Sequence, residues 1–124
     1  MFVTCAIIYN NDKIFVAKRG PGKSNSGKWE FPGGKLEPDE KPEDCIVREL
    51  KEELKIDIKP VKHLSTVHYV DNGTDITLSA FDCTIIKGEI TLTEHTESGF
   101  FSIEEIKKMD CTNPDKMIIA SLFK

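Results

Sequence analysis

The stretch GKWEFPGGKLEPDEKPEDCIVRELKEEL, residues 27–54, joins a glycine-containing turn to a run with helical periodicity. From Pro42 to Leu54 the apolar side chains recur at helical spacing, which predicts a helix with one buried face. Pro42 suits the first helical position because its missing N–H would have no partner there. The predicted buried face comprises Ile46, Val47, Leu50 and Leu54.

Three carboxylates share an arc of this predicted helix. Glu49, Glu52 and Glu53 are spaced so that their side chains lie beside one another, next to the apolar face. Like charges this close repel, so the arrangement is costly unless a cation occupies it. Mg²⁺ prefers oxygen ligands and is commonly held by a few carboxylates together with substrate phosphates. The alternative is a solvated face whose charge is softened by the basic neighbours Arg48, Lys51 and Lys55.

Two glycines precede the helix and favour the cation. Gly33 and Gly34 follow Pro32, and a backbone without Cβ atoms can turn tightly and approach a ligand closely. A loop that can approach a ligand closely and leads into a glutamate-rich helix is typical of a ligand site. It therefore favours a ligand site over a solvated helix face.

Composition indicates one globular domain, which we expect to span residues 1–124. Hydrophobic residues make up 39% and charged residues 31% of the chain, as in ordinary globular proteins. No apolar run approaches the ~20 residues of a membrane span, and no secretion signal is recognisable. We therefore expect a cytoplasmic protein without membrane contact. The cysteines lack C-x-x-C spacing, which predicts buried free thiols at Cys5, Cys45, Cys83 and Cys111.

The net charge disfavours one class of partner. With a formal charge of −4 and a pI of about 5.4, the chain offers no global basic field for a nucleic-acid polymer. A small phosphorylated ligand remains compatible, because a metal ion reverses the local sign of an acidic site.

The remaining pattern is mixed α and β. Turn residues Asn10-Asn11-Asp12 predict a hairpin between strands 3–9 and 13–18, and Asp71-Asn72-Gly73 predicts a second between 56–70 and 75–86. We expect a further short strand at EITLT, residues 89–93. A capping box predicts a short helix from Ser102 to about Met109, and a last helix is predicted over residues 113–123 with Asn113 as its cap.

The segment GKLEPDEKPEDCIVRELKEELKI, residues 34–56, resembles the Nudix box, and its flanks resemble the MutT-like branch of the Nudix hydrolase family. The resemblance extends more weakly over most of the chain, and only the box is specific by itself. One position departs, because Lys55 stands where the family has a glycine that ends the helix in a left-handed conformation. The matching positions are Gly34, Glu40, Arg48, Glu49, Leu50, Glu52, Glu53 and Ile56.

The resemblance implies a metal site. Glu49, Glu52 and Glu53 would hold Mg²⁺, with Mn²⁺ as an alternative. The Gly33 carbonyl and Glu94, which lies outside the box, would add further ligands. Family members use such cations in attack by water on a phosphorus of a pyrophosphate bridge, because the metal neutralises phosphate charge and acidifies the water.

The resemblance also implies catalytic roles. Arg48 would orient the glutamates through charge-assisted hydrogen bonds. Glu40 would lie just behind them or bind the metal through a water. Either Glu49 or Glu94 would take the proton of the attacking water. Glu97 is close enough to Glu94 in the sequence to leave that second assignment open, and an ordinary surface loop carboxylate is the alternative for Glu94.

Nucleotide contacts are implied for five residues. Arg19 and Phe31 would contact the nucleotide and its base, although a solvated strand end and an ordinary core residue are the alternatives. Gly34 and Lys35 would also contact the substrate. Asp115 would read the base, or would only complement a helix dipole. An ionised carboxylate accepts hydrogen bonds only, so Asp115 suits the amino group of cytosine or the adjacent N–H donors of a guanine-type edge.

The histidines His63, His68 and His95 show no metal-ligand spacing, and the sequence assigns them no role. Trp29 is expected in the core or in a pocket wall.

The resemblance implies an α/β fold, a mixed sheet sandwiched between helices. It implies Mg-dependent hydrolysis of a (deoxy)nucleoside triphosphate to the monophosphate and pyrophosphate, with 8-oxo-dGTP or CTP/dCTP as expected substrates. The alternatives are a nucleoside-diphosphate derivative, such as ADP-ribose or a dinucleoside polyphosphate, and a nucleotide-binding module without activity. Either a monomer or a homodimer is compatible with the sequence.

Overall fold

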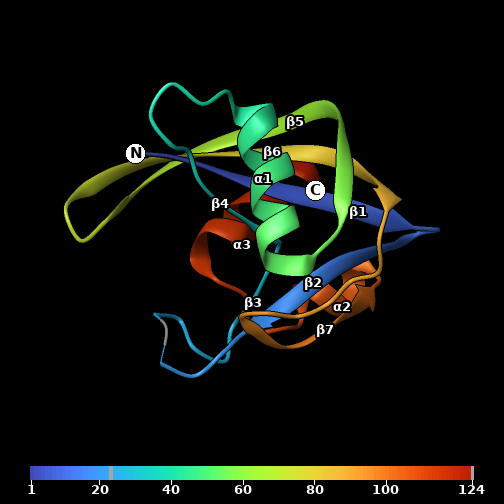
Figure 1. Ribbon diagram of the computed structural model, residues 1–124. Helices are drawn as coiled ribbons and strands as arrows, with labels where there is room; N and C mark the ends of the chain where they lie inside the picture. Colours follow the sequence, from blue (N-terminus) through green and yellow to red (C-terminus); the bar gives the residue numbers. More distant parts are fainter. Residues whose placement is uncertain (23, 124) are drawn as a thin grey trace.

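A computed structural model describes residues 1–22 and 24–123 and shows a mixed sheet with helices on both faces (Figure 1). The first strands, β1 and β2, form the predicted hairpin. The bounds of the elements are β1 Phe2–Asn10, β2 Lys13–Arg19, β3 Trp29–Glu30, β4 Gly33–Lys35, α1 Pro42–Leu54, β5 Asp57–Asp71, β6 Thr74–Lys87, β7 His95–Phe101, α2 Ile103–Lys107 and α3 Asn113–Leu122.

Strand β1 lies at the centre of the sheet, whose main order is β3-β2-β1-β6-β5. It runs parallel to β6, pairing Phe2 with Thr77 through Ile8 with Cys83. The short β4 pairs antiparallel with the start of β1, and β7 pairs antiparallel with β2. The sheet is therefore mixed, and β4 delivers the chain directly into α1.

Side-chain alternation along β1 and β2 divides the core into two layers. Cys5 and Ile7 of β1 point into the layer that packs against α2 and α3, together with Ile118 and Ile119. The intervening residues of β1 and β2 point to the opposite face and meet the buried side of α1. Figure 1 shows α1 on one face of the sheet and α3 on the other. The expected α/β sandwich is confirmed. The α1 layer contains Ala6, Ile8, Phe15, Ala17, Ile46, Leu50 and Leu54.

Both predicted hairpins and the box helix are confirmed. The second hairpin joins β5 to β6 through the turn at Asn72 and Gly73, with Asp71 opposite Thr74. The four cysteines are buried free thiols, as expected. Among the described residues, no helix combines the length and the apolar character that crossing a bilayer requires.

The predicted strand at residues 89–93 is wrong, because this segment serves the end of α1 instead of a sheet. The Thr91 N–H donates to the Leu54 carbonyl at 2.9 Å, and the Thr93 hydroxyl donates to the Glu53 carbonyl at 2.8 Å. These bonds satisfy carbonyls that a helix C-terminus leaves without partners. Ile90 and Leu92 meanwhile pack against the core layer under α1.

Two helix ends differ from the sequence prediction by one or two residues. The capping box of α2 is present, with Ser102 and Glu105 bonding each other's backbone N–H, and the helix ends at Lys107. The N-cap of α3 is Thr112 and not Asn113, which occupies the first helical position. Asp115 therefore lies in the first turn of α3, three residues after the cap instead of the predicted two.

Lys55 ends α1 in the left-handed conformation, with φ 60° and ψ 31°, where glycine is favoured. Its backbone N–H donates to the Lys51 carbonyl at 3.1 Å, so the helix end is formed despite the side chain. We expect Lys55→Gly to raise the free energy of unfolding by about 0.5 to 1 kcal/mol, because it removes left-handed strain. Urea unfolding measures this, with Lys55→Ala as control. A Lys55→Gly protein no more stable than Lys55→Ala would contradict the expectation.

Candidate active site

The β4 strand and the second half of α1 bring a glycine backbone against a carboxylate. A Cβ placed on Gly34 would overlap the carboxyl group of Glu49, and one placed on Gly33 would lie 2.7 Å from the Cα of Cys5. Neither position has room for a side chain. The two glycines thus allow β4 to pass between β1 and the glutamate face of α1, as the sequence predicts for a close approach.

Arg48 is the hub of the glutamate cluster. Its guanidinium donates to Glu40 through two nitrogens, at 2.8 and 2.9 Å, and to Glu49 Oε1 at 2.9 Å. It also lies 3.3 Å from Glu52 Oε2, and it donates to the Lys35 carbonyl at 3.1 Å. One planar group therefore links the loop before α1 to the first two glutamates of the predicted metal set.

These bonds set the charges of the cluster. The hydrogen bonds from Arg48, together with the backbone N–H of Glu37, lower the pKa of Glu40 from 4.5 to about 2. The same pairing raises the pKa of Arg48 above its ordinary value, so the guanidinium stays charged. Glu40 is consequently an anion over the whole working range of pH, and it holds Arg48 in place from behind.

Glu49 and Glu53 behave as a coupled pair. Burial raises the pKa of Glu53 from 4.5 to about 9, and the negative charges of Glu49, Glu30 and Glu94 add to the effect. Burial also raises the pKa of Glu49, opposed by its bonds from Arg48. The raised pKa of Glu53 means that this carboxyl is mostly protonated near neutral pH.

A cavity of about 250 Å³ opens beside this pair, and we call it the glutamate cavity. Glu49, Glu53 and Glu94 line it, so the structure brings these three predicted site residues together. Glu52 does not line it. Its side chain is 59% exposed and faces Arg48. The other lining residues are Arg19, Glu30, Gly33, Gly34, Lys35 and His95.

Glu97, the alternative to Glu94, lies away from the glutamate cavity. Its carboxylate is exposed and pairs with Lys18 at 3.2 Å. The geometry therefore favours Glu94 over Glu97 as the site residue of this loop.

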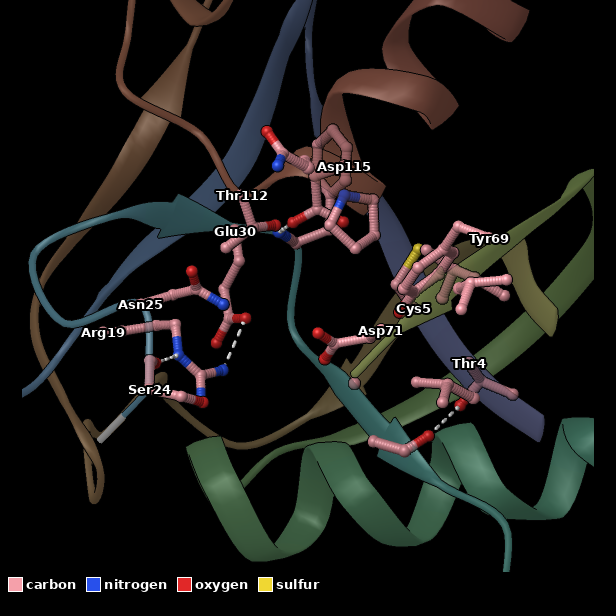
Figure 2. A pocket seen from close by; sticks show the side chains of 18 residues that line it. Thr4, Cys5, Arg19, Ser24, Asn25, Glu30, Tyr69, Asp71, Thr112 and Asp115 are labelled. Carbon is pink, nitrogen blue, oxygen red and sulfur yellow. Dashed lines mark hydrogen bonds and ion pairs between the residues drawn. The ribbon is translucent and has the colours of Figure 1, made fainter. Parts of the chain in front are cut away.

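A second cavity of about 350 Å³ adjoins the first, and we call it the Asp115 cavity (Figure 2). Arg19, Glu30, Gly33 and Gly34 line both cavities, so they form the passage between them. Figure 2 shows Arg19 and Glu30 on one side of the Asp115 cavity and Tyr69 and Cys5 on the other. Phe31 also lines it but is only 4% exposed and belongs to the core as well.

Asp115 lies at the inner end of this cavity and is 5% exposed. Its Oδ2 accepts a hydrogen bond from the Phe31 N–H at 2.9 Å. Burial raises the pKa of Asp115 to about 7, and the charge of Glu30 adds to this, whereas the Phe31 bond lowers it. A buried carboxyl with a pKa near neutrality can offer either a donor or an acceptor to a ligand, depending on pH.

Sequence reasoning missed Glu30 and His95, and assigned His95 no role. Glu30 accepts from Arg19 Nη1 at 2.8 Å and from His95 Nε2 at 2.9 Å. The two residues are 65 positions apart, and β7, which carries His95, was not predicted. Glu30 precedes the Phe-Pro-Gly-Gly turn, and this place in the chain was the one available signal for it.

The donor set fits a divalent cation in part. Glu53 Oε2 is buried and has no hydrogen-bond partner among the described residues, beside the Glu49 carboxylate. No three His, Cys, Asp or Glu side chains within residues 1–22 and 24–123 form a complete coordination group. Two protein carboxylates match the way Mg²⁺ is usually bound, with water and substrate phosphates supplying the remaining ligands.

Known proteins with similar sequences and structures identify the family of this chain. A NUDIX domain matches residues 2–121. An 8-oxo-dGTP diphosphatase from Proteus vulgaris is 43% identical over 81 residues, 65% of this chain and 72% of that protein. A CTP pyrophosphohydrolase from Escherichia coli (strain K12) is 36% identical over 103 residues, 83% of this chain and 76% of that protein.

Among solved structures, the ORF135 protein of E. coli superposes with a TM-score of 0.85 at 31% identity, over 97% of this chain and 86% of that one. The resemblance seen in the sequence is thereby confirmed, and so is the fold that it implies. With a family match over nearly its whole length, the chain belongs to the NUDIX family of hydrolases.

Proposed function

We propose that the protein hydrolyses a (deoxy)nucleoside triphosphate to the monophosphate and pyrophosphate, with Mg²⁺ as the cofactor and Mn²⁺ as a substitute. The observation that carries the proposal is the partly buried Glu49–Glu53 pair, with one buried oxygen of Glu53 unpartnered among the described residues, in a cavity that adjoins the one lined by Asp115. The glutamate pair suits a cation and phosphates, and the Asp115 cavity is large enough for a base and its sugar.

The residues of the glutamate cavity would have different roles in the reaction. Glu49 and Glu53 would hold the cation, and we keep Glu52, Glu94 and the Gly33 carbonyl as further proposed ligands. When bound, the cation supplies charge neutralisation on the phosphate oxygens and a more acidic water. Arg48 would keep Glu49 aimed into the cavity, as its bond at 2.9 Å supports.

Either Glu49 or Glu94 would accept the proton from the attacking water. Both line the glutamate cavity, so both have access to a water there. A general base must reach the proton within hydrogen-bond distance, directly or through one water. Proton transfer to a positioned carboxylate contributes about 10²- to 10⁴-fold in such reactions.

The Asp115 cavity would select the nucleotide. Arg19 and Lys35 would meet the phosphates or sugar near the passage between the cavities, and Phe31 would bound the base. The carboxyl of Asp115 would accept hydrogen bonds from the N–H groups of 8-oxoguanine or cytosine. The names of the two relatives described above, one acting on 8-oxo-dGTP and one on CTP, support both bases for this chain.

Exchanging Asp115 for Asn tests the base assignment. The amide can still accept from the Phe31 N–H, but it presents N–H donors instead of acceptors to the cavity. We expect kcat/KM to fall about 10- to 100-fold for the preferred base, since a mismatched polar contact in a buried site costs about 1.5 to 3 kcal/mol. The folded protein should keep its stability, because Asp115 is partly neutral at pH 7.

The measurement is a panel of triphosphates, including 8-oxo-dGTP, dGTP, CTP, dCTP, dATP and dTTP, with ADP-ribose added. Products are identified by chromatography. Asp110→Asn is the matched control, because this nearby carboxylate is 70% exposed and pairs only loosely with Lys28, at 3.7 Å. A clear preference for ADP-ribose, or tight nucleotide binding without turnover at saturating Mg²⁺, would contradict the proposal.

Three further expectations stay with the proposal. The partner is a small nucleotide and not a nucleic-acid polymer, in keeping with a net charge of −4. A cytoplasmic location and a monomeric or homodimeric state remain predictions from the sequence.

A further inference from the structure

His95 occupies the first position of β7, at an irregular point of the sheet. It is the partner of Arg19 on β2, and the register shifts between Lys18 and Arg19. Such a bulge re-aims the side chains that follow it and is common beside active sites. Both Arg19 and His95 line the glutamate cavity.

The His95 side chain is 4% exposed, and its Nε2 donates to Glu30 Oε2 at 2.9 Å. Because the Glu30 carboxylate can only accept, the proton of the ring lies on Nε2. The other Glu30 oxygen accepts from Arg19 Nη1 at 2.8 Å. Glu30 is thus held from both sides, with each oxygen assigned to one partner.

We infer that His95 is a positioning residue. Its hydrogen bond to Glu30, which lines both the glutamate cavity and the Asp115 cavity, holds Glu94 and Arg19 in fixed positions relative to each other. The inference rests on the proposed function, because the residues that His95 would position act in the proposed hydrolysis. Glu94 directly precedes His95, so fixing the ring fixes the peptide that carries the Glu94 carboxylate.

Backbone packing supports a fixed position for Glu94. A Cβ on Gly20 would lie 2.8 Å from the Glu94 carbonyl oxygen, so the chain directly after β2 passes against this residue. On the other side, the Glu30 carboxylate lines the glutamate cavity together with Glu49 and Glu53. His95 and Arg19 occupy both Glu30 oxygens and so keep this carboxylate from competing for a cation bound by Glu49 and Glu53.

The test compares leucine, asparagine and glutamine at position 95. His95→Leu keeps apolar volume without a donor, and His95→Asn keeps an amide too short to reach Glu30. His95→Gln places its amide nitrogen near the position of Nε2. The control is His63→Leu, because His63 Nε2 also bonds one side chain, Thr66 at 2.7 Å, but lies on an exposed part of β5.

The first readout is binding of Mn²⁺ alone, followed by the loss of the free-ion electron paramagnetic resonance signal. We expect the Mn²⁺ Kd to rise about 10- to 100-fold in His95→Leu and His95→Asn, the usual effect of losing a group that orients metal ligands. In His95→Gln the Kd should return to within about threefold of the wild type, and in His63→Leu it should not change. The circular dichroism spectrum shows which variants are folded.

Wild-type Mn²⁺ affinity in folded His95→Leu or His95→Asn would overturn the inference, as would an equal loss in His95→Gln or a wild-type protein that binds no Mn²⁺. If His95→Leu fails to fold, the Asn and Gln pair decides. The second readout is triphosphate hydrolysis, where KM should rise with the Mn²⁺ Kd. A wild type that binds Mn²⁺ but hydrolyses no triphosphate would overturn the proposed function alone, since the metal titration does not depend on turnover.

Discussion

Glu53→Gln should lower kcat about 10³-fold while making the metal-free protein more stable. The loss follows from removing one of the two partly buried carboxylates that would hold the cation. Neutralisation of transition-state charge by such a cation is worth several kcal/mol. The gain follows from the raised pKa of Glu53, about 9 against an ordinary 4.5, which marks a carboxyl that folding forces to stay protonated. A neutral amide avoids that cost, which is on the order of 3 kcal/mol at pH 7.

The same pKa predicts how stability depends on pH without metal. Between 4.5 and about 9, folded Glu53 keeps its proton while the unfolded chain has released it. The unfolded state therefore binds fewer protons, and the free energy of unfolding falls as the pH rises through this window. Below 4.5 both states are protonated and above about 9 both are ionised, so the contribution of Glu53 stops changing. Glu53→Gln should flatten this slope.

Denaturant unfolding in EDTA at pH 5, 7 and 9 measures the slope, and pyrophosphate release measures kcat. Glu43→Gln is the control, since Glu43 lies exposed in the first turn of the same helix. Full activity in both Glu52→Gln and Glu53→Gln would contradict the proposed cation site. An unchanged pH slope in Glu53→Gln would contradict the buried, protonated state of Glu53.

Arg48→Ala should be the second most damaging change. The substitution removes the ion pairs of the guanidinium with Glu40 and Glu49, at 2.8 and 2.9 Å. It also removes the hydrogen bond to the Lys35 carbonyl. We expect a loss of about 10²-fold in kcat/KM, because Glu49 is no longer aimed into the cavity. The Arg48 side chain is 24% exposed, so solvent screening limits the loss of folding free energy to about 1 to 2 kcal/mol.

Arg48→Lys separates charge from geometry. A lysine keeps the positive charge but cannot donate to Glu40 and Glu49 at once with a planar fork. We expect it to recover most of the stability and little of the activity. Steady-state kinetics and thermal unfolding of both variants give the comparison. Wild-type activity in Arg48→Lys would show that the fork has no part in positioning Glu49.

Features encoded by neighbouring residues were predictable from the sequence. The Asn10-Asn11-Asp12 turn, the apolar stripe of α1 and the capping box at Ser102 each depend on a few adjacent residues, and the structure contains all three. The register of Glu49 and Glu53 on one helix face is local in the same sense, and it brings both into the glutamate cavity.

Features that depend on distant partners were not predictable. Residues 89–93 have a strand-like composition, but their N–H and hydroxyl groups bond the end of α1. His95 carries no local motif, and its role arises only once β7 pairs with β2 and Glu30 comes within 2.9 Å. Arg19 likewise depends on Glu30 and on the Ser24 carbonyl, 2.7 Å from its Nε, for its place in the passage between the cavities.

Calorimetric titration of Mg²⁺ in buffers of different ionisation enthalpy tests most directly whether Glu49 and Glu53 form the cation site. A metal ligand must be deprotonated, so binding to a carboxyl with a pKa of about 9 has to displace its proton. We expect release of about one proton per Mg²⁺ bound at pH 7, and none in Glu53→Gln, which should also bind more weakly. Mg²⁺ binding without proton release, or with equal affinity in Glu53→Gln, would contradict the assignment.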